Sequence, residues 1–243
     1  MKNIVLFTDF GPFGPYVGEM VAAIRNVAPS VPVLELLNNA PTYDPKHSAY
    51  LLAALVKGFP PETIFLCVVD PGVGSERKAV VLEADGRFFV GPSNGLFNTV
   101  AKEAKEKRWF EIVWRPQRLS SSFHGRDLFA PVAAKIARGQ HEELLLPWEG
   151  PDLSNWPLEL AEVIYIDWFG NCWTGLRFRP ELKEKRLQVA GRQLPWARTF
   201  SEVPKRSSFW YENASGLIEI AVNGGRADEV LGTRIGDPVS WSP

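Results

Sequence analysis

Strands and helices alternate regularly at the start of this 243-residue chain, and this alternation limits the possible folds more than any other feature. Short apolar runs predict strands at residues 3–8, 32–37 and 63–69. Between them, apolar residues at helical spacing predict one helix that begins near Pro15 and another that begins at Pro45, with Asp44 as its N-cap. Such connections are right-handed crossovers and indicate a largely parallel sheet. We therefore expect an α/β domain in this part of the chain.

The pattern changes after residue 77. Residues 78–84 and 87–91 predict two strands, and the Asp85-Gly86 pair between them is typical of a tight hairpin. A helix with Leu96 and Val100 on its apolar side follows, and we interpret the charged run at 102–108 as its solvated face. The segments after it predict a strand at 109–114 and a helix at 128–138, ended by Gly139.

A stretch rich in Pro, Gly and Trp at residues 147–157 predicts a linker, which separates a domain at 1–146 from a second domain at 158–243. The second domain shows turns and no convincing helix. Its expected strands are 162–167, 188–189, 208–211, 217–222 and a last segment to Val239. We expect a small all-β domain with a barrel-like arrangement.

Composition excludes several classes of partner and location. The net charge is −1 and the isoelectric point is about 6.3, so nothing favours nucleic acid or an anionic membrane as a partner. The two cysteines, Cys67 and Cys172, do not make a disulfide framework and fit a reducing compartment. The apolar runs at 4–7 and 49–56 are too short for a signal peptide or a membrane span. We expect a soluble cytoplasmic protein.

Three polar loops follow predicted elements of the first domain. Asp9 ends the first strand, and Asp70 ends the strand at 63–69, with Arg77 returning seven residues later. His124 stands in a Gly-bounded loop farther along the chain. Loops at the carboxyl ends of strands bind ligands in open α/β sheets, so we expect these side chains to border a cleft. For Asp70 and Arg77 alone, a capped turn with a surface ion pair is the alternative interpretation.

Several common chemistries lack their sequence signatures. Histidine and cysteine do not cluster at metal-ligand spacing, so no metal site is expected. A nucleophile elbow, a P-loop and a dinucleotide-binding glycine pattern are also missing from the sequence. We therefore expect no cofactor.

Several different multi-residue motifs follow one another along nearly the whole chain. In the first domain they are Thr8-Asp9-Phe10-Gly11, Tyr16-Val17-Gly18, Val69-Asp70-Pro71-Gly72-Val73-Gly74, Gly91-Pro92 with Asn94-Gly95-Leu96, and Phe123-His124-Gly125-Arg126-Asp127. In the second they are Ile166-Asp167-Trp168-Phe169-Gly170-Asn171, Thr199-Phe200 and Gly216-Leu217-Ile218-Glu219-Ile220-Ala221-Val222-Asn223. Together these motifs resemble the S-adenosyl-L-methionine hydroxide adenosyltransferases, the water-using relatives of the fluorinating and chlorinating enzymes.

The resemblance implies a Rossmann-like N-terminal domain, a β-barrel C-terminal domain and a homotrimer with active sites between subunits. It also implies hydrolysis of S-adenosyl-L-methionine at C5′ to adenosine and L-methionine, without a cofactor. The family's Asp-Arg-His set matches Asp70, Arg77 and His124. Further substrate contacts are implied at Asp9, Tyr43, Asp167, Asn171, Phe200, Ser215, Glu219 and Val222.

Each implied contact has a part of the substrate assigned to it. Asp9 matches the carboxylate that holds both ribose hydroxyls, and Tyr43 an aromatic position near the sugar. Asn171 and Phe200 match adenine contacts, the second by stacking. The remaining positions line the methionine or adenine end; they are Asp167, Glu219, Val222 and Ser215, the last beside Ala214, where the family usually has serine.

The implied chemistry suits these side chains, because a sulfonium already carries its leaving group. The reaction then needs a water aligned opposite the sulfur and made more nucleophilic. Asp70 can accept a proton from that water, while Arg77 and His124 can stabilise developing hydroxide.

The sequence departs from the family pattern at several positions. The family often has Asp where this chain has Gly14 and Ser93, and its Asp-Ile-(Thr/Ser)-His segment is Glu35-Leu36-Leu37-Asn38 here.

Two other functions stay open. One is a non-catalytic protein that binds adenosine or S-adenosylmethionine. The other is a halide-using adenosyl transferase, which fits less well because those enzymes have an aromatic residue at the Asp70 position and an inserted loop.

Overall fold

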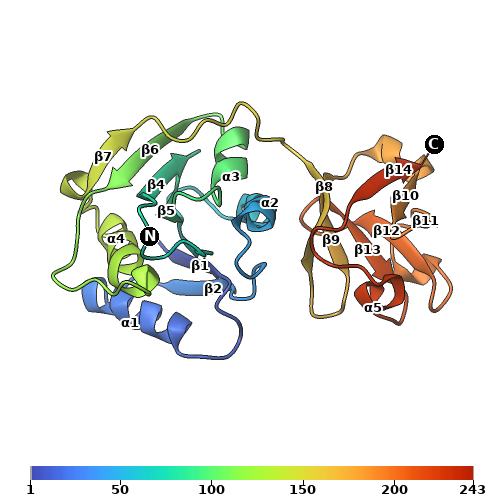
Figure 1. Ribbon diagram of the computed structural model, residues 1–243, viewed down its shortest axis with the longest axis horizontal. Coiled ribbons are helices and arrows are strands. Elements are labelled where there is room, and N and C mark those ends of the chain that lie inside the picture. The colour runs from blue at the N-terminus through green and yellow to red at the C-terminus, as the bar shows by residue number, and fades with distance from the viewer. Residues whose placement is uncertain (1, 243) are drawn as a thin grey trace. The chain divides into compact units, whose positions relative to one another are not determined.

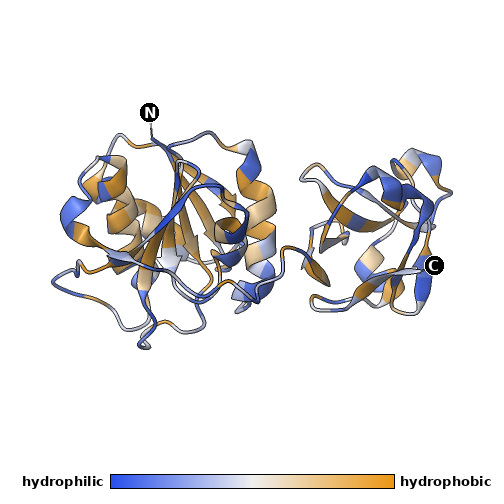
Figure 2. Ribbon diagram, turned by 90° about the horizontal axis from the view of Figure 1, so that it is seen from above, coloured by the Kyte–Doolittle hydropathy of each residue, from blue (hydrophilic) through white to orange (hydrophobic). Residues whose placement is uncertain are grey.

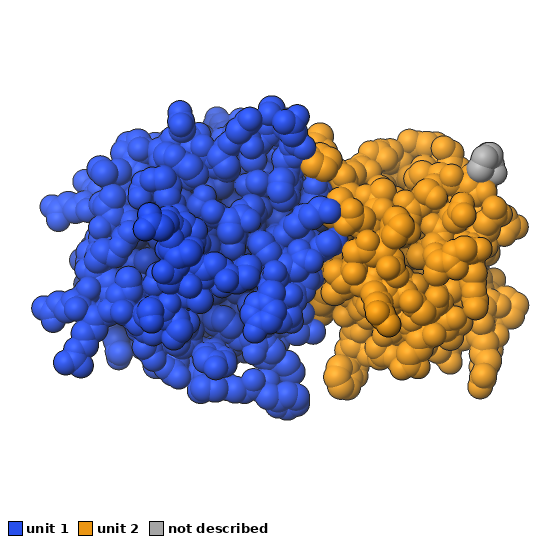
Figure 3. All heavy atoms as spheres, viewed as in Figure 1, with its two compact units in different colours: residues 1–52, 58–156 blue, residues 53–57, 157–243 orange. Residues whose placement is uncertain are grey.

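The computed structural model describes residues 2–242, which form two compact units (Figures 1 and 3). The first unit comprises residues 2–52 and 58–156, and the second comprises residues 157–242 together with 53–57. None of the helices within residues 2–242 has the length and apolar composition that crossing a membrane requires.

The first unit is built on a seven-stranded sheet of order β2-β1-β3-β5-β4-β6-β7. Its parallel half contains β1 (Ile4–Thr8), β2 (Val33–Leu37), β3 (Ile64–Val68) and β5 (Arg87–Pro92). Its antiparallel half contains β4 (Ala79–Ala84), β6 (Lys107–Ile112) and β7 (Leu145–Trp148). The α/β architecture that the alternating sequence predicts is therefore present, with a parallel sheet extended by an antiparallel edge.

Four helices belong to this sheet: α1 (Tyr16–Val27), α2 (Pro45–Leu55), α3 (Asn98–Glu103) and α4 (Ala130–Ala137). Met20 and Ile24 of α1 pack with Val132 of α4 and alternate residues of the strands in one buried cluster. Burying these apolar side chains supplies most of the drive for folding. In Figure 2 the strands of this unit are coloured as hydrophobic, which is typical of a sheet covered on both faces.

Local signals in the first unit are confirmed where they were strong. α2 begins at Pro45, and the backbone N–H of His47 donates a 3.1 Å hydrogen bond to Asp44 Oδ1 as the N-cap pattern predicts. Asp85 and Gly86 adopt positive φ angles of 46° and 75° between β4 and β5. These angles fit the two-residue turn that matches strand twist.

One interpretation of the first unit was wrong, and one helix begins earlier than expected. The charged run at 102–108 is not one helix face, because α3 ends at Glu103 and Lys107 and Arg108 open β6. There Arg108 lies opposite Glu83 of β4, with 2.7 Å between Nη2 and Oε2. The helix expected at 128–138 is present as α4, and a π-type turn at Gly125–Phe129 precedes it.

The second unit consists of two antiparallel sheets. One has the order β12-β13-β9-β8 and contains β8 (Leu160–Ile166), β9 (Cys172–Arg177), β12 (Ser208–Glu212) and β13 (Leu217–Val222). The other has the order β11-β10-β14 and contains β10 (Arg186–Val189), β11 (Arg192–Leu194) and β14 (Val239–Ser242). The largely β character is confirmed, whereas closure into a barrel is a prediction that these two sheets do not test.

The prediction of a helix-free second half was wrong, since α5 (Ala227–Leu231) follows β13. β9 and β11 were not predicted. Gly175 lies inside β9, where an added Cβ would come within 2.6 Å of the Leu160 carbonyl oxygen. A glycine required by this close approach interrupts the strand pattern in the sequence.

The chain between the sheets contains ordered contacts. Pro147 and Trp148, the first residues of the expected linker, lie in β7. Trp156 at the end of the first unit stacks on Tyr50 with ring centroids 5.8 Å apart, and its Nε1 donates a 3.0 Å hydrogen bond to Thr99 Oγ1. Short 3₁₀ turns complete the molecule at Val56–Gly58, Glu142–Leu144, Pro180–Glu184 and Phe200–Glu202.

Candidate active site

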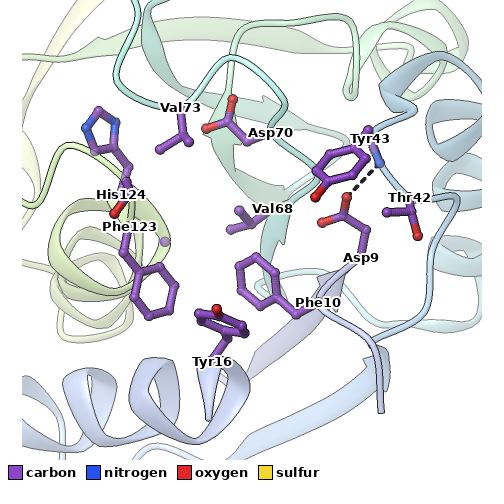
Figure 4. Close-up of a pocket in the computed structure, with 12 residues that line it drawn as sticks. Asp9, Phe10, Tyr16, Thr42, Tyr43, Val68, Asp70, Val73, Phe123 and His124 are labelled. Carbon is purple, nitrogen blue, oxygen red and sulfur yellow. Dashed lines mark hydrogen bonds between the residues drawn. The ribbon is translucent and has the colours of Figure 1, made fainter. Parts of the chain in front are cut away.

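A cavity of about 280 Å³ opens in the first unit beside the carboxyl ends of β1 and β3 (Figure 4). It has a polar side and an aromatic side. The lining residues are Asp9, Phe10, Tyr16, Thr42, Tyr43, Val68, Asp70, Val73, Ser122, Phe123, His124 and Gly125. Four of the predicted site residues therefore face one space, as expected for loops at this edge of a parallel sheet.

Arg77 holds the Asp70 carboxylate in a fork. Its Nε lies 2.8 Å from Oδ1 and 3.0 Å from Oδ2, and its Nη2 lies 2.5 Å from Oδ2. The side chain of Asp70 is 4% exposed and that of Arg77 is 9% exposed. The guanidinium also lies over the ring of buried Phe129, 5.3 Å from its centroid. A charge pair this buried is fixed in geometry, which excludes the surface ion pair as the interpretation of these residues.

His124 completes the network through its Nδ1 atom, 3.0 Å from Arg77 Nη2. A guanidinium only donates, so Nδ1 is the acceptor and the neutral ring carries its proton on Nε2. Burial and the charge of Arg77 lower the pKa of His124, while Asp70 partly offsets this effect. The imidazole is thus held neutral near pH 7, with one N–H to donate.

Asp9 forms the other polar corner of the cavity. Its Oδ2 accepts a 2.9 Å hydrogen bond from the backbone N–H of Tyr43, and this contact is drawn in Figure 4. Burial raises the pKa of Asp9, and the hydrogen bond from Tyr43 opposes the rise. Tyr43 itself has a positive φ of 59° and is largely exposed. The carboxylate of Asp9 lines the cavity, where it can accept hydrogen bonds from a ligand.

The loop that carries Asp70 is fixed from two sides. Asn94 Nδ2 donates a 2.8 Å hydrogen bond to the carbonyl of Val69, and the N–H of Leu96 donates to Asn94 Oδ1 at 3.3 Å. Gly74 has a φ of 79°, and an added Cβ would lie 2.4 Å from the carbonyl oxygen of Ser121. Glycine thus lets this loop approach the segment that leads to His124. The role of Asn94 was missed, although the sequence motif that contains it was noted.

Three aromatic rings form the opposite side of the cavity, and sequence reasoning did not assign them a role. Centroid distances are 5.5 Å for Phe10–Tyr16, 5.8 Å for Phe10–Phe123 and 5.4 Å for Tyr16–Phe123. We call these three rings the aromatic wall; in Figure 4 they lie below Val68. Three aromatic residues close to the first acidic strand end, Phe10, Phe13 and Tyr16, were the available signal.

The second unit has its own hollow, of about 620 Å³. Five predicted contacts line it, namely Asp167, Asn171, Phe200, Glu219 and Val222, together with Phe169, Trp173, Tyr211, Asn213, Ala214, Gly224 and Gly225. Ser215 lies outside this lining and donates its backbone N–H to Asn213 Oδ1 at 3.0 Å. The aromatic ring of Phe200 meets Phe209 and Tyr211, with centroids 5.2 Å and 5.6 Å away.

Glu219 is the most buried acid of this hollow, at 2% exposure. Tyr211 donates its hydroxyl to Oε1, and Asn213 Nδ2 donates to Oε2 at 3.0 Å. Burial raises the pKa of Glu219, and these hydrogen bonds oppose the rise. Asp167 is engaged by the backbone N–H groups of Phe169 and Asn171, each 2.9 Å from Oδ1. The hollow therefore offers carboxylates and amides to a ligand that carries donors.

No group of three or more His, Cys, Asp or Glu side chains within residues 2–242 is arranged to hold a metal ion. Both cysteines are free and buried. The polar groups are arranged for proton transfer and for hydrogen bonding to a small molecule.

Comparison with known proteins matches both units to the two domains of one family. The chain matches the SAM hydroxide adenosyltransferase N-terminal domain at residues 4–145 and the SAM hydroxide adenosyltransferase C-terminal domain at residues 161–240. It is 38% identical to an (R)-S-adenosyl-L-methionine hydrolase of Thermus thermophilus, covering 98% of this chain and 99% of the relative. It is 34% identical to an enzyme of the same name from Salinispora arenicola, covering 95% and 94%.

A solved structure shows the same fold. The crystal structure of an uncharacterized conserved protein from Thermotoga maritima superposes with a TM-score of 0.90 at 31% identity. The superposition covers 99% of this chain and 100% of that one.

Proposed function

This chain belongs to the S-adenosyl-L-methionine hydroxide adenosyltransferase family, and we propose that it hydrolyses S-adenosyl-L-methionine at C5′ to adenosine and L-methionine. One observation carries the proposal. Asp70, held by Arg77 and linked through it to neutral His124, faces a cavity that Asp9 also lines. A site for binding alone would not need a fixed carboxylate beside a neutral imidazole donor.

The reaction can be written with its atoms balanced. A water oxygen forms a bond to C5′ while the C5′–S bond breaks, and its electron pair stays on sulfur. The sulfonium becomes the neutral thioether of methionine, and the former positive charge leaves as a proton from the attacking water. Catalysis therefore needs an aligned water and an acceptor for one proton.

The three residues divide this task. Asp70 orients the water and accepts its proton through Oδ1, because Arg77 donates two hydrogen bonds to Oδ2 and only one to Oδ1, which keeps a free lone pair. Arg77 fixes the carboxylate and stabilises negative charge that develops on the water oxygen. The Nε2–H of His124 is a second donor for that oxygen, and its neutral state avoids adding another full positive charge beside the sulfonium.

The remaining predicted residues bind the rest of the substrate. Asp9 would accept hydrogen bonds from both ribose hydroxyls, with Tyr43 near the sugar. Asn171 and Phe200 would contact adenine. Asp167, Glu219, Val222 and Ser215 would lie toward the methionine or adenine end.

We also infer the assembly and location that the family resemblance implies. The protein would work as a cytoplasmic homotrimer with active sites between subunits, and the sheets of the second unit would close into a barrel-like domain. Charge and hydropathy support a cytoplasmic protein without nucleic-acid or membrane partners. Light scattering that gives a 27.2 kDa monomer at micromolar concentration would contradict the trimer.

The substrate epimer is a finer part of the proposal. The curated relatives are named for the (R) form of S-adenosyl-L-methionine. We therefore expect faster turnover of the (R) sulfonium than of the (S) sulfonium. Separate assays of the two purified epimers decide this point, and equal rates would contradict it.

Incubation with S-adenosyl-L-methionine in ¹⁸O-labelled water tests the function. We expect chromatography to show adenosine and methionine, and mass spectrometry to show one ¹⁸O atom in the 5′-hydroxyl of adenosine. Binding without any product would support the non-catalytic alternative. A 5′-halogenated nucleoside formed in chloride would support the halide-using one.

A further inference from the structure

The aromatic wall borders the same cavity as the proposed catalytic residues. Phe10 follows β1, Tyr16 begins α1, and Phe123 directly precedes His124, which caps the π-type turn. All three side chains line the same cavity as Asp70 and Asp9 (Figure 4). Their planes are steeply inclined, at 79° for Phe10–Phe123 and 88° for Tyr16–Phe123. The cluster therefore presents both ring faces and ring edges to the space in front of the polar groups.

The charges around this cavity are nearly balanced. Asp70 is neutralised by its buried pairing with Arg77, and the pKa of His124 is lowered, so the ring is uncharged near pH 7. Asp9 is left as one acid, and its role in the proposed function is to bind ribose hydroxyls. The segment 10–16, Phe-Gly-Pro-Phe-Gly-Pro-Tyr, contains no Asp or Glu. Glu19 of α1 and Asp127 are both paired with Arg126, so a full positive charge on a ligand is not met by an unpaired carboxylate on this side.

Aromatic faces attract cations through their quadrupole, and one ring of the wall already does so. Arg126 Cζ lies 5.1 Å from the centroid of Phe123. The attraction is worth about 0.5–1 kcal/mol at exposed sites and about 2 kcal/mol where the cation is desolvated. A sulfonium is a soft, weakly hydrated cation that donates no hydrogen bonds, so ring faces can hold it without a hydrogen-bonding partner.

We propose that the aromatic wall formed by Phe10, Tyr16 and Phe123 holds the positively charged sulfonium of the substrate and discriminates it from a neutral thioether. The inference rests on the proposed function and adds the residues that recognise the charge. It also links recognition to release. When the C5′–S bond breaks, sulfur loses its charge, and the attraction between the wall and methionine ends with the reaction.

Two uncleaved ligands test this without requiring catalysis. One is the analogue of S-adenosyl-L-methionine in which a protonated nitrogen replaces sulfur. The other is S-adenosyl-L-homocysteine, which is neutral at that position. For Tyr16→Leu we expect calorimetry to show a loss of about two- to thirtyfold in affinity for the cation, with little change for the thioether. Tyr16→Phe keeps the ring and should keep the ratio of the two affinities.

Graded fluorination of Phe10 gives a test that a purely structural role would not pass. Each added fluorine weakens the quadrupole and hardly changes ring shape. We expect the logarithm of affinity for the cation to fall in steps across the mono-, di- and trifluorinated proteins, while affinity for the thioether stays constant. Fluorination of Phe59 is the matched control. Phe59 precedes β3, contacts Phe65 within that strand and does not line the cavity.

Equal losses for both ligands, or a flat fluorination series, would overturn the inference and show that the wall is only a hydrophobic surface. Hydrolysis of S-adenosyl-L-methionine by the same preparation would leave the proposed function standing. Failure of the unaltered protein to bind either ligand would contradict both.

Discussion

Arg77 Nη2 lies 3.0 Å from His124 Nδ1, although 47 positions separate the two residues in the chain. Arg77 returns from the loop after β3, whereas His124 stands just before the π-type turn that leads into α4. Because the guanidinium can only donate, this contact fixes which imidazole nitrogen carries the proton. The state of His124 is therefore set by a residue whose other partner is the proposed base.

His124 should give the enzyme an acid limb in its pH profile. The pKa of His124 is lowered from 6.5, so the ring stays neutral at pH 7 and takes up a proton only below that value. A protonated Nδ1 cannot accept from Arg77, and we expect turnover to fall as pH decreases through a midpoint below 6.5. In His124→Asn, which keeps an acceptor but does not titrate, this limb should disappear from rates measured at saturation. An unchanged limb would assign it to another group.

Asp70 should act mainly in the transition state. For Asp70→Ala we expect turnover to fall by about 10²–10⁴, the range typical of a positioned base, with affinity for substrate nearly intact. Asp70→Asn keeps the size but offers only one oxygen to Arg77, so we expect a similar loss. Initial-rate assays across substrate concentrations separate turnover from the Michaelis constant. A large rise in the Michaelis constant with unchanged turnover would instead make Asp70 an electrostatic anchor.

Asp9 should contribute to the affinity for adenosine independently of the chemistry. Asp9→Ala removes the acceptor for the ribose hydroxyls, and we expect a loss of about 2–4 kcal/mol in binding free energy. Calorimetry with adenosine measures this directly. Asp9→Asn retains an acceptor and should lose less. Equal affinity in the alanine variant would remove Asp9 from the binding site.

Asn94 should position Asp70 without touching the substrate. Its amide holds the Val69 carbonyl at 2.8 Å, one residue before Asp70. We expect Asn94→Ala to lower turnover by about fivefold while changing the Michaelis constant little, because loss of one buried hydrogen bond is worth about 1 kcal/mol. Asn94→Asp keeps the acceptor for Leu96 but not the donor, and should resemble alanine. A loss confined to thermal stability would reduce Asn94 to a structural role.

Glu219 should make the protein less stable as pH rises. Burial raises its pKa above 4.5, so between that value and its folded-state pKa the native protein holds more protons than the unfolded chain. The free energy of unfolding should therefore decline with increasing pH in this window. Glu219→Gln can still accept from Asn213 and should abolish that part of the decline in urea titrations. The same slope in both proteins would contradict the assignment.

Glu219→Ala provides the companion measurement. It leaves the Tyr211 hydroxyl and Asn213 Nδ2 without their acceptor, and Asn213 cannot turn because its Oδ1 accepts from the N–H groups of Ser215 and Leu217. We expect a loss of about 2–4 kcal/mol in the free energy of unfolding at neutral pH.

Much of the first unit could be predicted because its local signals agree with its tertiary structure. Buried β1 and β3 are continuous apolar runs, and α2 begins at a proline that follows a capping aspartate. The charged run before Trp109 was wrongly interpreted as a helix face, because charged residues in a strand and on a helix face look alike over seven residues. There the pairing of Arg108 with Glu83 on the neighbouring strand decided the structure, and the sequence does not display that pairing.

The candidate site was predictable in part for a similar reason. Strand ends identify Asp9 and Asp70 from local sequence, and the family resemblance adds His124. The contact of His124 with Arg77 depends on Gly74, which lets two loops approach, and such proximity is a property of the fold. The aromatic wall was missed because Phe10, Tyr16 and Phe123 have the same apolar character as core residues.

The anchoring of Trp156 sets where chimaeras of relatives should be joined. Its ring stacks on Tyr50 and its indole N–H is bonded to Thr99, so this tryptophan is packed against partners far upstream in the first unit. Exchanging everything after residue 146 would replace Pro147 and Trp148 of β7. It would also separate Tyr50 and Thr99 from the tryptophan that they contact. A crossover just after Trp156 transfers the second unit's sheets and leaves the recipient's own sheet edge and stacking pair undisturbed.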